Sequence, residues 1–137
     1  DSREQRQESV QMGYSLRQLL AALPETASQP LPAALQDGEL AFLLAYGWAG
    51  CRLGLDEATV VQAYLWGWLE NQVMVLMKAL PMGQTAGQQL MSALLPALAA
   101  ASEQALILPD ARLSAMAPMQ SWMALRHETQ YSRLFRS

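Results

Sequence analysis

Cysteine and histidine are nearly missing from the sequence: Cys51 and His127 are single occurrences among 137 residues. One cysteine cannot form an internal disulfide, which is compatible with a reducing compartment. A metal site usually needs three or four convergent ligands, more than one cysteine and one histidine supply. Nucleophilic catalysis needs a general base, and His127 is the only histidine that could serve as one. We therefore predict a non-catalytic chain without metal or cofactor, in which Cys51 is a small buried thiol. A metal site using both residues across a dimer axis stays open as an alternative.

Charged residues are also scarce, at 15% of the chain, and the net charge of −3 is unevenly distributed. Residues 112–137 hold four arginines and one glutamate, whereas the rest of the chain holds five basic and eleven acidic residues. Nucleic-acid binding calls for a clustered basic face, which an acidic body does not provide. The basic end instead predicts contact with an acidic surface on a protein partner.

Long apolar runs and a leader are not visible either. The first nine residues are polar throughout, unlike a signal peptide. A membrane span needs about 20 consecutive apolar residues, and the closest segment, 58–80, is interrupted by polar and charged side chains. We predict a cytoplasmic chain with no membrane contact.

Strand signals are nearly absent, because β-branched residues are few and never alternate with polar ones. Leu, Ala, Met and Gln dominate, and all are good helix formers. We predict an all-α fold: a helical bundle of about five to six helices with no sheet, forming a single domain over residues 1–137. The expected helices are 3–23, 38–52, 57–80, one that starts near 84 with a kink or split at Pro96, and a last one that begins at Pro118.

Apolar residues at spacings of three and four predict which face of each helix is buried. The expected faces are Met12, Leu16, Leu19, Leu20 and Leu23 in the first helix, Leu40, Leu43, Leu44, Gly47 and Cys51 in the second, and Leu90, Met91, Leu94, Leu95 and Leu98 in the fourth. The third helix is apolar nearly all round, which is typical of a buried central helix. Ala63 and Gly67 suit a close helix crossing there, and Asp37 and Asp56 are expected N-caps.

The arginine-rich end, residues 126–137, is the most informative segment. If residues 119–136 are helical, one face carries His127, Tyr131, Leu134 and Phe135, and another carries Arg126, Arg133 and Arg136. An apolar row flanked by arginines suits docking into a groove with an acidic rim. The alternative is an amphipathic end that packs back on its own domain.

A second candidate contact region surrounds Lys78. Met74, Met77 and Met82 cluster about this lysine near the end of the third helix. Methionines are adaptable core filler, but they are also enriched at protein interfaces. Both interpretations stay open for this group.

Several segments resemble the urease accessory protein family UreF. Residues 127–137, HETQYSRLFRS, look like the ending of its bacterial members, and residues 78–85, KALPMGQT, resemble its Lys-Leu-Val-Pro-Leu-Gly-Gln stretch. Residues 63–71 resemble the long helix before that stretch, and the first helix resembles the family's Glu-Thr-Arg-Glu-Leu-Arg region. The early Pro-Val-Gly-Gly run of the family is absent. We therefore expect the C-terminal portion of a longer UreF-like domain, with a partner-docking tail at 126–137.

The resemblance implies an all-α scaffold without catalysis. It implies that the chain bridges the accessory protein UreD (UreH in some organisms) and the GTPase UreG while nickel is inserted into apo-urease. Nickel and GTP would be bound by the partners. By residue match, the expected partner-binding residues are Lys78, Tyr131, Arg133, Leu134, Phe135 and Arg136. The alternative function is a helical module that forms a homodimer or binds an unrelated partner through its Met- and Trp-rich surface.

Overall fold

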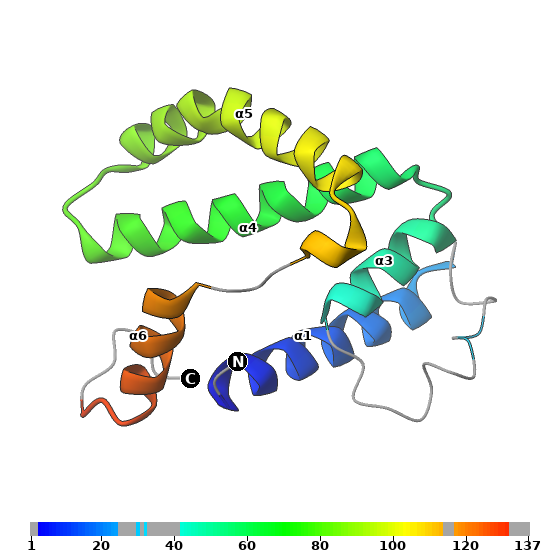
Figure 1. The fold of residues 1–137 in the computed structure, drawn as a ribbon, viewed down its shortest axis with the longest axis horizontal. Coiled ribbons are helices and arrows are strands. Elements are labelled where there is room, and N and C mark those ends of the chain that lie inside the picture. Colours follow the sequence, from blue (N-terminus) through cyan, green and yellow to red (C-terminus); the bar gives the residue numbers. More distant parts are fainter. Residues whose placement is uncertain (1–2, 25–29, 31, 33–41, 114–116, 132–137) are drawn as a thin grey trace. The chain divides into compact units, whose positions relative to one another are not determined.

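The computed structural model describes residues 3–24, 30, 32, 42–113 and 117–131. These residues form five α-helices and one short 3-10 helix, and they contain no strand, so the predicted all-α class is confirmed. The helices are α1 (Arg3–Ala22), α3 (Phe42–Arg52), α4 (Glu57–Ala79), α5 (Gln84–Ile107), the 3-10 helix Asp110–Arg112, and α6 (Pro118–Glu128) (Figure 1).

The chain divides into two compact units. The first comprises residues 1–55 and 114–137 and contains α1, α3 and α6; the second comprises residues 56–113 and contains α4 and α5. Each unit is described by itself below.

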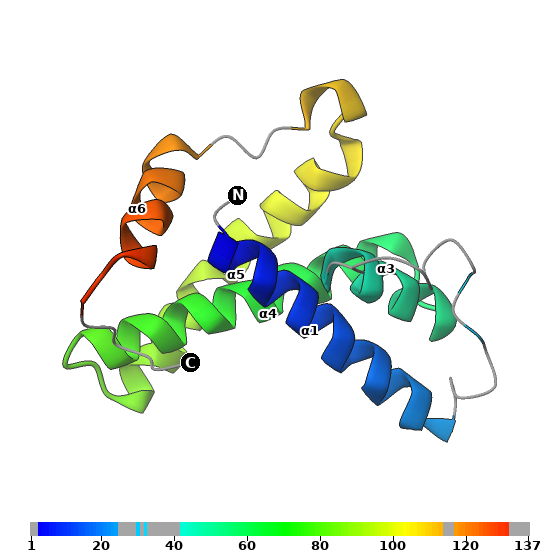
Figure 2. The same ribbon diagram turned by 90° about the horizontal axis from the view of Figure 1, so that it is seen from below.

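In the first unit, α1 and α3 pack side by side (Figures 1 and 2). The backbone N–H of Phe42, at the start of α3, donates to Ser9 Oγ on α1 at 3.2 Å. The helices meet through small residues, because Gly13 on α1 and Ala45 and Ala49 on α3 are buried. Leu20 on α1 is also buried, with 2% of its surface exposed.

The predicted faces of these two helices are only partly correct. Leu20 is buried as expected, but Met12 and Leu19 are exposed. In α3 the face prediction is wrong, because Leu43 and Leu44 are exposed and the small residues point inward instead. Small residues permit a closer approach between helix axes, and the buried residues of α3, which packs against α1, are small. Asp37 and Leu40 lie outside the described residues.

The second unit is a hairpin of α4 and α5, joined by a short turn after Leu80 (Figure 1). Val73, Gly87, Met91 and Ser102 are its buried residues. The two helices approach closely at Gly87, where an added Cβ would overlap Sδ of Met77. Ala63 and Gly67 do not mark a crossing among the described residues, since Ala63 is exposed and nothing lies within 4 Å of a Cβ built on Gly67.

The expectation that α4 is buried on all sides is wrong for the described residues. Its large side chains Trp66, Trp68 and Met74 are exposed, and only Val73 is buried. The reason is geometric: α5 packs along one side of α4 and covers one face. In α5, Met91 is buried as predicted, whereas Leu95 is exposed.

The helix ends follow local chemistry. Asp56 is the predicted N-cap of α4, and its carboxylate accepts hydrogen bonds from Thr59 N at 2.9 Å and Thr59 Oγ1 at 2.8 Å. These bonds, the backbone one above all, lower the pKa of Asp56 because they stabilise its charged form. Pro118 occupies the first turn of α6 as predicted. Pro96 does not split α5, which continues through it as one curved helix (Figure 1).

One described helix, α5, is long and apolar enough to cross a membrane by length and composition. The prediction that residues 58–80 come nearest to a membrane span is wrong for the described residues, because α5 passes this test and α4 does not. A single such helix is weak evidence, because the core helix of a soluble protein has the same composition.

Candidate protein-docking surface

Helix α6 presents an uncovered apolar face. Met119, Trp122 and Met123 fall at spacings of three and four, and all three are exposed, Trp122 with 57% of its surface. The guanidinium of Arg126 lies over the Trp122 ring, 5.7 Å from its centroid. No residue of α6 is buried. An aromatic ring, two methionines and an arginine are the residue types enriched at protein interfaces.

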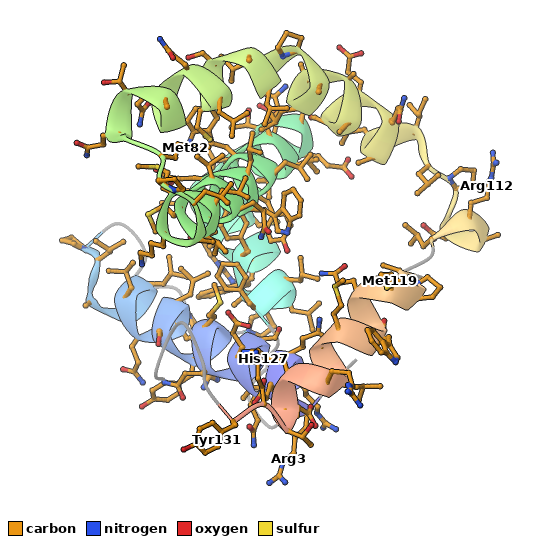
Figure 3. All side chains as sticks on the ribbon, turned by 90° about the vertical axis from the view of Figure 1, so that its left-hand side faces the viewer. Arg3, Met82, Arg112, Met119, His127 and Tyr131 are labelled. Carbon is orange, nitrogen blue, oxygen red and sulfur yellow. The ribbon has the colours of Figure 1, made fainter. Side chains whose placement is uncertain are left out.

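The far end of α6 is held against the start of α1 by a three-residue cluster, here called the Glu4 clamp. His127 Nδ1 lies 2.8 Å from Glu4 Oε2. The backbone N–H of Glu4 donates to Glu128 Oε1 at 3.3 Å. Figure 3 shows His127 close to the first turn of α1, near Arg3. One glutamate therefore meets two successive residues of α6, once through its carboxylate and once through its backbone.

The predicted docking tail begins where α6 ends. The helix stops at Glu128, with Thr129 as its C-cap, and Tyr131 lies beyond it with its side chain fully exposed (Figure 3). The predicted helix therefore does not include Tyr131, and His127 and Tyr131 do not share a helical face. The other expected docking residues, Arg133, Leu134, Phe135 and Arg136, lie outside the described residues.

Lys78 is in the second unit, in the last turn of α4, and it is exposed. The methionines around it have different surroundings. Met74 is exposed, whereas Met77 is half-buried against Gly87 on α5. The group therefore serves both as core filler and as exposed surface: Met77 packs inside the hairpin, and Met74 lies on the surface.

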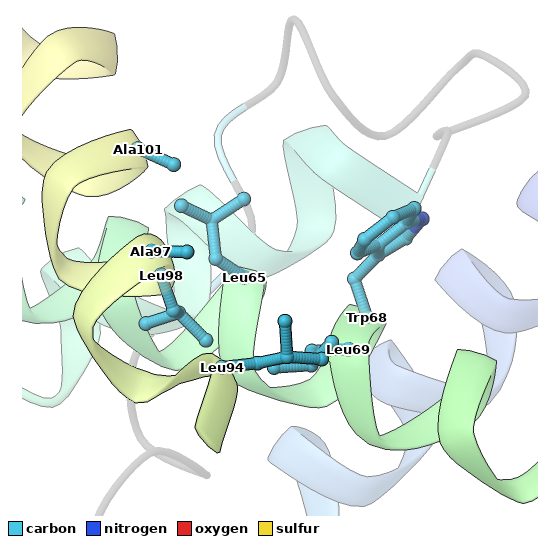
Figure 4. A pocket seen from close by; sticks show the side chains of 7 residues that line it. All are labelled: Leu65, Trp68, Leu69, Leu94, Ala97, Leu98 and Ala101. Carbon is cyan, nitrogen blue, oxygen red and sulfur yellow. The ribbon is translucent and has the colours of Figure 1, made fainter. Parts of the chain in front are cut away.

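A shallow apolar groove of about 230 Å³ runs along the α4–α5 hairpin (Figure 4). The side chains that line it are Leu65, Trp68, Leu69, Leu94, Ala97, Leu98 and Ala101. Leu94 and Leu98 are predicted to face the interior, and in the structure both are only half-buried. Their spacing was the correct signal for a shared face, but spacing does not tell whether a third helix covers that face.

The two residues considered for metal binding are both exposed. Cys51 was predicted to be a buried thiol, and this is wrong, because α3 turns Ala45 and Ala49 toward α1 rather than Cys51. His127 pairs with Glu4. In the part of the chain that the structure describes, no three His, Cys, Asp or Glu side chains form a group that could hold a metal ion.

Comparison with known proteins places these features in a family. The sequence model of the UreF family matches residues 1–95. The chain is 48% identical over 139 residues to the urease accessory protein UreF of Ectopseudomonas mendocina, and 47% identical over 142 residues to that of Nitrosococcus oceani. Each alignment covers 100% of this chain and 61% of the relative.

A more distant relative aligns in the same way. The UreF of Dechloromonas aromatica is 40% identical over 138 residues, covering 100% of this chain and 60% of its own length. The chain thus spans about three fifths of the length of the curated relatives that it matches. Because the family model matches well over half of the chain and these relatives align along all of it, the chain belongs to the UreF family of urease accessory proteins.

Proposed function

We propose that this chain is a non-catalytic scaffold in the cytoplasmic maturation of urease. It bridges UreD/UreH and the GTPase UreG while nickel is inserted into apo-urease, and those partners hold the nickel and the GTP. The observation that carries the proposal is the alignment of all 137 residues with proteins named urease accessory protein UreF. We further propose that residues 1–137 act as one helical domain with a docking tail at 126–137.

Exposed side chains of α6, and Tyr131 beyond it, support docking to a protein. Met119, Trp122 and Met123 offer an apolar anchor, and Arg126 adds a cation beside it. Interface energy is typically concentrated in a few Trp, Tyr and Arg residues surrounded by weaker contacts. Tyr131 continues this series beyond the helix with a fully exposed ring. In the proposal Arg133, Leu134, Phe135 and Arg136 extend the same contact.

Lys78 is proposed as a separate contact on the second unit. It is exposed in the last turn of α4, next to exposed Met74 and Leu76. A cation at a helix C-terminus is favoured by the helix dipole, so the position suits a lysine. A partner surface with carboxylates and an apolar centre fits this region.

Co-elution with UreD/UreH tests the docking proposal with three forms of this chain. The full chain is compared with a form ending at Gln130, which keeps α6, and a form ending at Ala117, which removes it. We expect co-elution of the full chain, weaker co-elution of the Gln130 form, and none for the Ala117 form. Equal co-elution of all three would show that the contact lies on the rest of the chain and that the tail assignment is wrong.

Point variants separate docking from folding. Arg133→Ala and Arg136→Ala should weaken the complex, whereas Arg112→Ala removes an equal charge from the 3-10 helix and should not. Helicity measured by circular dichroism should stay the same in all three. If the Arg112 variant loses as much binding as the tail variants, the effect is one of net charge, and the proposed site is refuted.

The alternative is a homodimer or an unrelated partner that binds the exposed tryptophans of α4. Trp66 and Trp68 are both exposed, and Trp68 borders the apolar groove. Sizing chromatography with light scattering separates the two proposals. A dimer that Trp68→Ala converts to monomer, without any effect of the tail truncations on binding, would favour the alternative.

A further inference from the structure

Helix α6 carries two methionines and a histidine at a regular spacing. Met119, Met123 and His127 follow one another at intervals of four residues, so they share one face of the helix. Figure 3 shows Met119 at the start of α6 and His127 near its end. Met119 is 65% exposed and Met123 58%, and 47% of the His127 side chain is exposed. Two thioethers and one imidazole therefore lie in a row on a surface that solvent reaches.

The imidazole of this row is oriented by a carboxylate. His127 Nδ1 lies 2.8 Å from Glu4 Oε2, and an ionised carboxylate can only accept a hydrogen bond, so Nδ1 carries a proton. In the neutral ring the free lone pair is then on Nε2, which is the nitrogen that can bind a metal. Histidines that bind metals ordinarily donate their other N–H in this way, because the bond fixes the ring and strengthens it as a ligand. The Glu4 contact therefore prepares His127 to bind a metal through Nε2.

The spacing allows the three side chains to reach one ion. Residues four apart on a helix have Cβ atoms about 5–6 Å apart. Side chains on a helix lean toward its start, so His127 extends over the turn that carries Met123. Met119 approaches from the opposite side, and its long unbranched side chain has three rotatable bonds with which to turn back toward Met123. Met123 is therefore the central ligand, with one neighbour a turn away on each side.

The ligand types and the nearby charges decide which ion fits. Mg²⁺ and Ca²⁺ need oxygen ligands, whereas thioether sulfur is soft and selects Cu(I). Cu(I) also accepts low coordination numbers, and its single charge needs little compensation from the ligands. Glu4 and Glu128 lie beside His127 and supply negative charge there. The guanidinium of Arg126, the nearest cation on α6, lies over the Trp122 ring at 5.7 Å from its centroid.

We propose that Met119, Met123 and His127 form a surface site for Cu(I), a soft monovalent metal ion. Glu4 is a positioning residue, which orients the imidazole and does not touch the ion. The site uses one helix of a single chain, unlike a site that joins Cys51 and His127 across a dimer axis. It is independent of the proposed function, because it needs neither a partner protein nor nickel.

Competition with bicinchoninate, a chromogenic Cu(I) chelator, measures the affinity without oxygen and with ascorbate as the reductant. Every form of the full chain carries Cys51→Ser, because the exposed thiol of Cys51 is itself a soft ligand. Met123→Leu keeps the volume of the side chain and removes the sulfur, so it should lower the affinity at least about tenfold. Met74→Leu is the matched control: it removes an exposed thioether from α4 and should leave the affinity unchanged.

Substitutions of Glu4 test its positioning role. Glu4→Ala removes the acceptor for His127 Nδ1 and should lower the affinity for Cu(I) about 10–100-fold. Glu4→Gln keeps an oxygen that accepts from Nδ1 and should restore most of this loss. Glu8→Ala removes an exposed carboxylate one turn further along α1 and should have no effect. Equal affinities of the alanine variants at both positions would refute the role of Glu4, and circular dichroism checks that every variant stays helical.

Methyl NMR of the methionines identifies the ligands directly. Addition of Cu(I) should shift the Cε methyl resonances of Met119 and Met123, because their sulfurs bind the ion. The methyls of Met12 and Met74, which are exposed on other helices, should not shift. The proposal is overturned if Met123→Leu binds Cu(I) as tightly as Met74→Leu, or if the Met119 and Met123 methyls do not respond. In either case the methionines of α6 are contact surface only.

Discussion

Replacing Gly87 by alanine tests how closely α5 approaches α4. Alanine is favoured over glycine in a helix by about 0.8–1.0 kcal/mol, so the substitution would normally stabilise the chain. At Gly87, however, the new methyl group would overlap Sδ of Met77, with Cγ at 3.2 Å and Cε at 3.3 Å. Met77 must leave its place or the helices must separate, and such overpacking costs typically about 1–3 kcal/mol. We expect a net destabilisation of roughly 0–2 kcal/mol.

Gly67→Ala is the matched control in the partner helix. Gly67 lies in the interior of α4, and nothing lies within 4 Å of a Cβ at this position. The propensity gain should appear there without an opposing clash, as a stabilisation of about 0.5–1 kcal/mol. The difference between the two substitutions therefore measures the cost of the contact between Gly87 and Met77.

Urea unfolding followed by far-UV circular dichroism measures both changes. The midpoint should rise for Gly67→Ala and stay the same or fall for Gly87→Ala, with an unchanged dependence of the unfolding free energy on urea. Met77→Ala removes the obstructing side chain, so Gly87→Ala should become stabilising in that background. This change of sign is the coupling expected of residues in contact. Equal stabilisation by both glycine substitutions in the unaltered background would refute the described packing of α4 on α5.

Three further predictions concern the core, a helix cap and metal binding. Leu20→Ala removes a side chain with 2% exposure and should lower the free energy of unfolding by about 2–5 kcal/mol, which urea titration measures, whereas the exposed Leu19→Ala should have a far smaller effect. The pKa of Asp56 is lowered in the folded chain, so its cap stabilises α4 above about pH 4 and is lost as the pH falls through the folded value. A pH titration of helicity should show this loss, and Asp56→Asn should keep a cap without the acid response. Calorimetric titration of nickel into this chain should give no binding heat at micromolar protein, and saturable binding abolished by Cys51→Ser or His127→Gln would contradict this.

Features that depend on a few neighbouring residues could be predicted from the sequence. The cap at Asp56 with Thr59 and the start of α6 at Pro118 are set by local hydrogen bonding and by the fixed φ of proline, and both are confirmed. The bounds of α1 and α4 also agree with the prediction within a residue, and α5 starts where it was predicted to start. Family membership was recognised from short local motifs, and it is confirmed as well.

Predictions about burial were less successful, because burial depends on which helix lies opposite. The leucines of α3 looked like a core face, but the contact with α1 uses Ala45 and Ala49, whose small side chains allow closer packing. The apolar surface of α4 suggested a central helix, yet α5 covers one face and leaves Trp66 and Trp68 exposed. Periodicity identifies the residues that share a helix face, but it does not tell whether another helix packs against that face.

The sequence by itself determined the helical class, the main helix ends and the family, because helix propensity, capping and motifs act over a few residues. Only the tertiary structure decided that Glu4 meets His127 and Glu128, which are more than 120 positions away along the chain. It also decided that Met77 closes on Gly87 while the face of α6 around Trp122 stays open. These outcomes depend on how helices dock, and docking is a balance among many weak contacts that no single segment encodes.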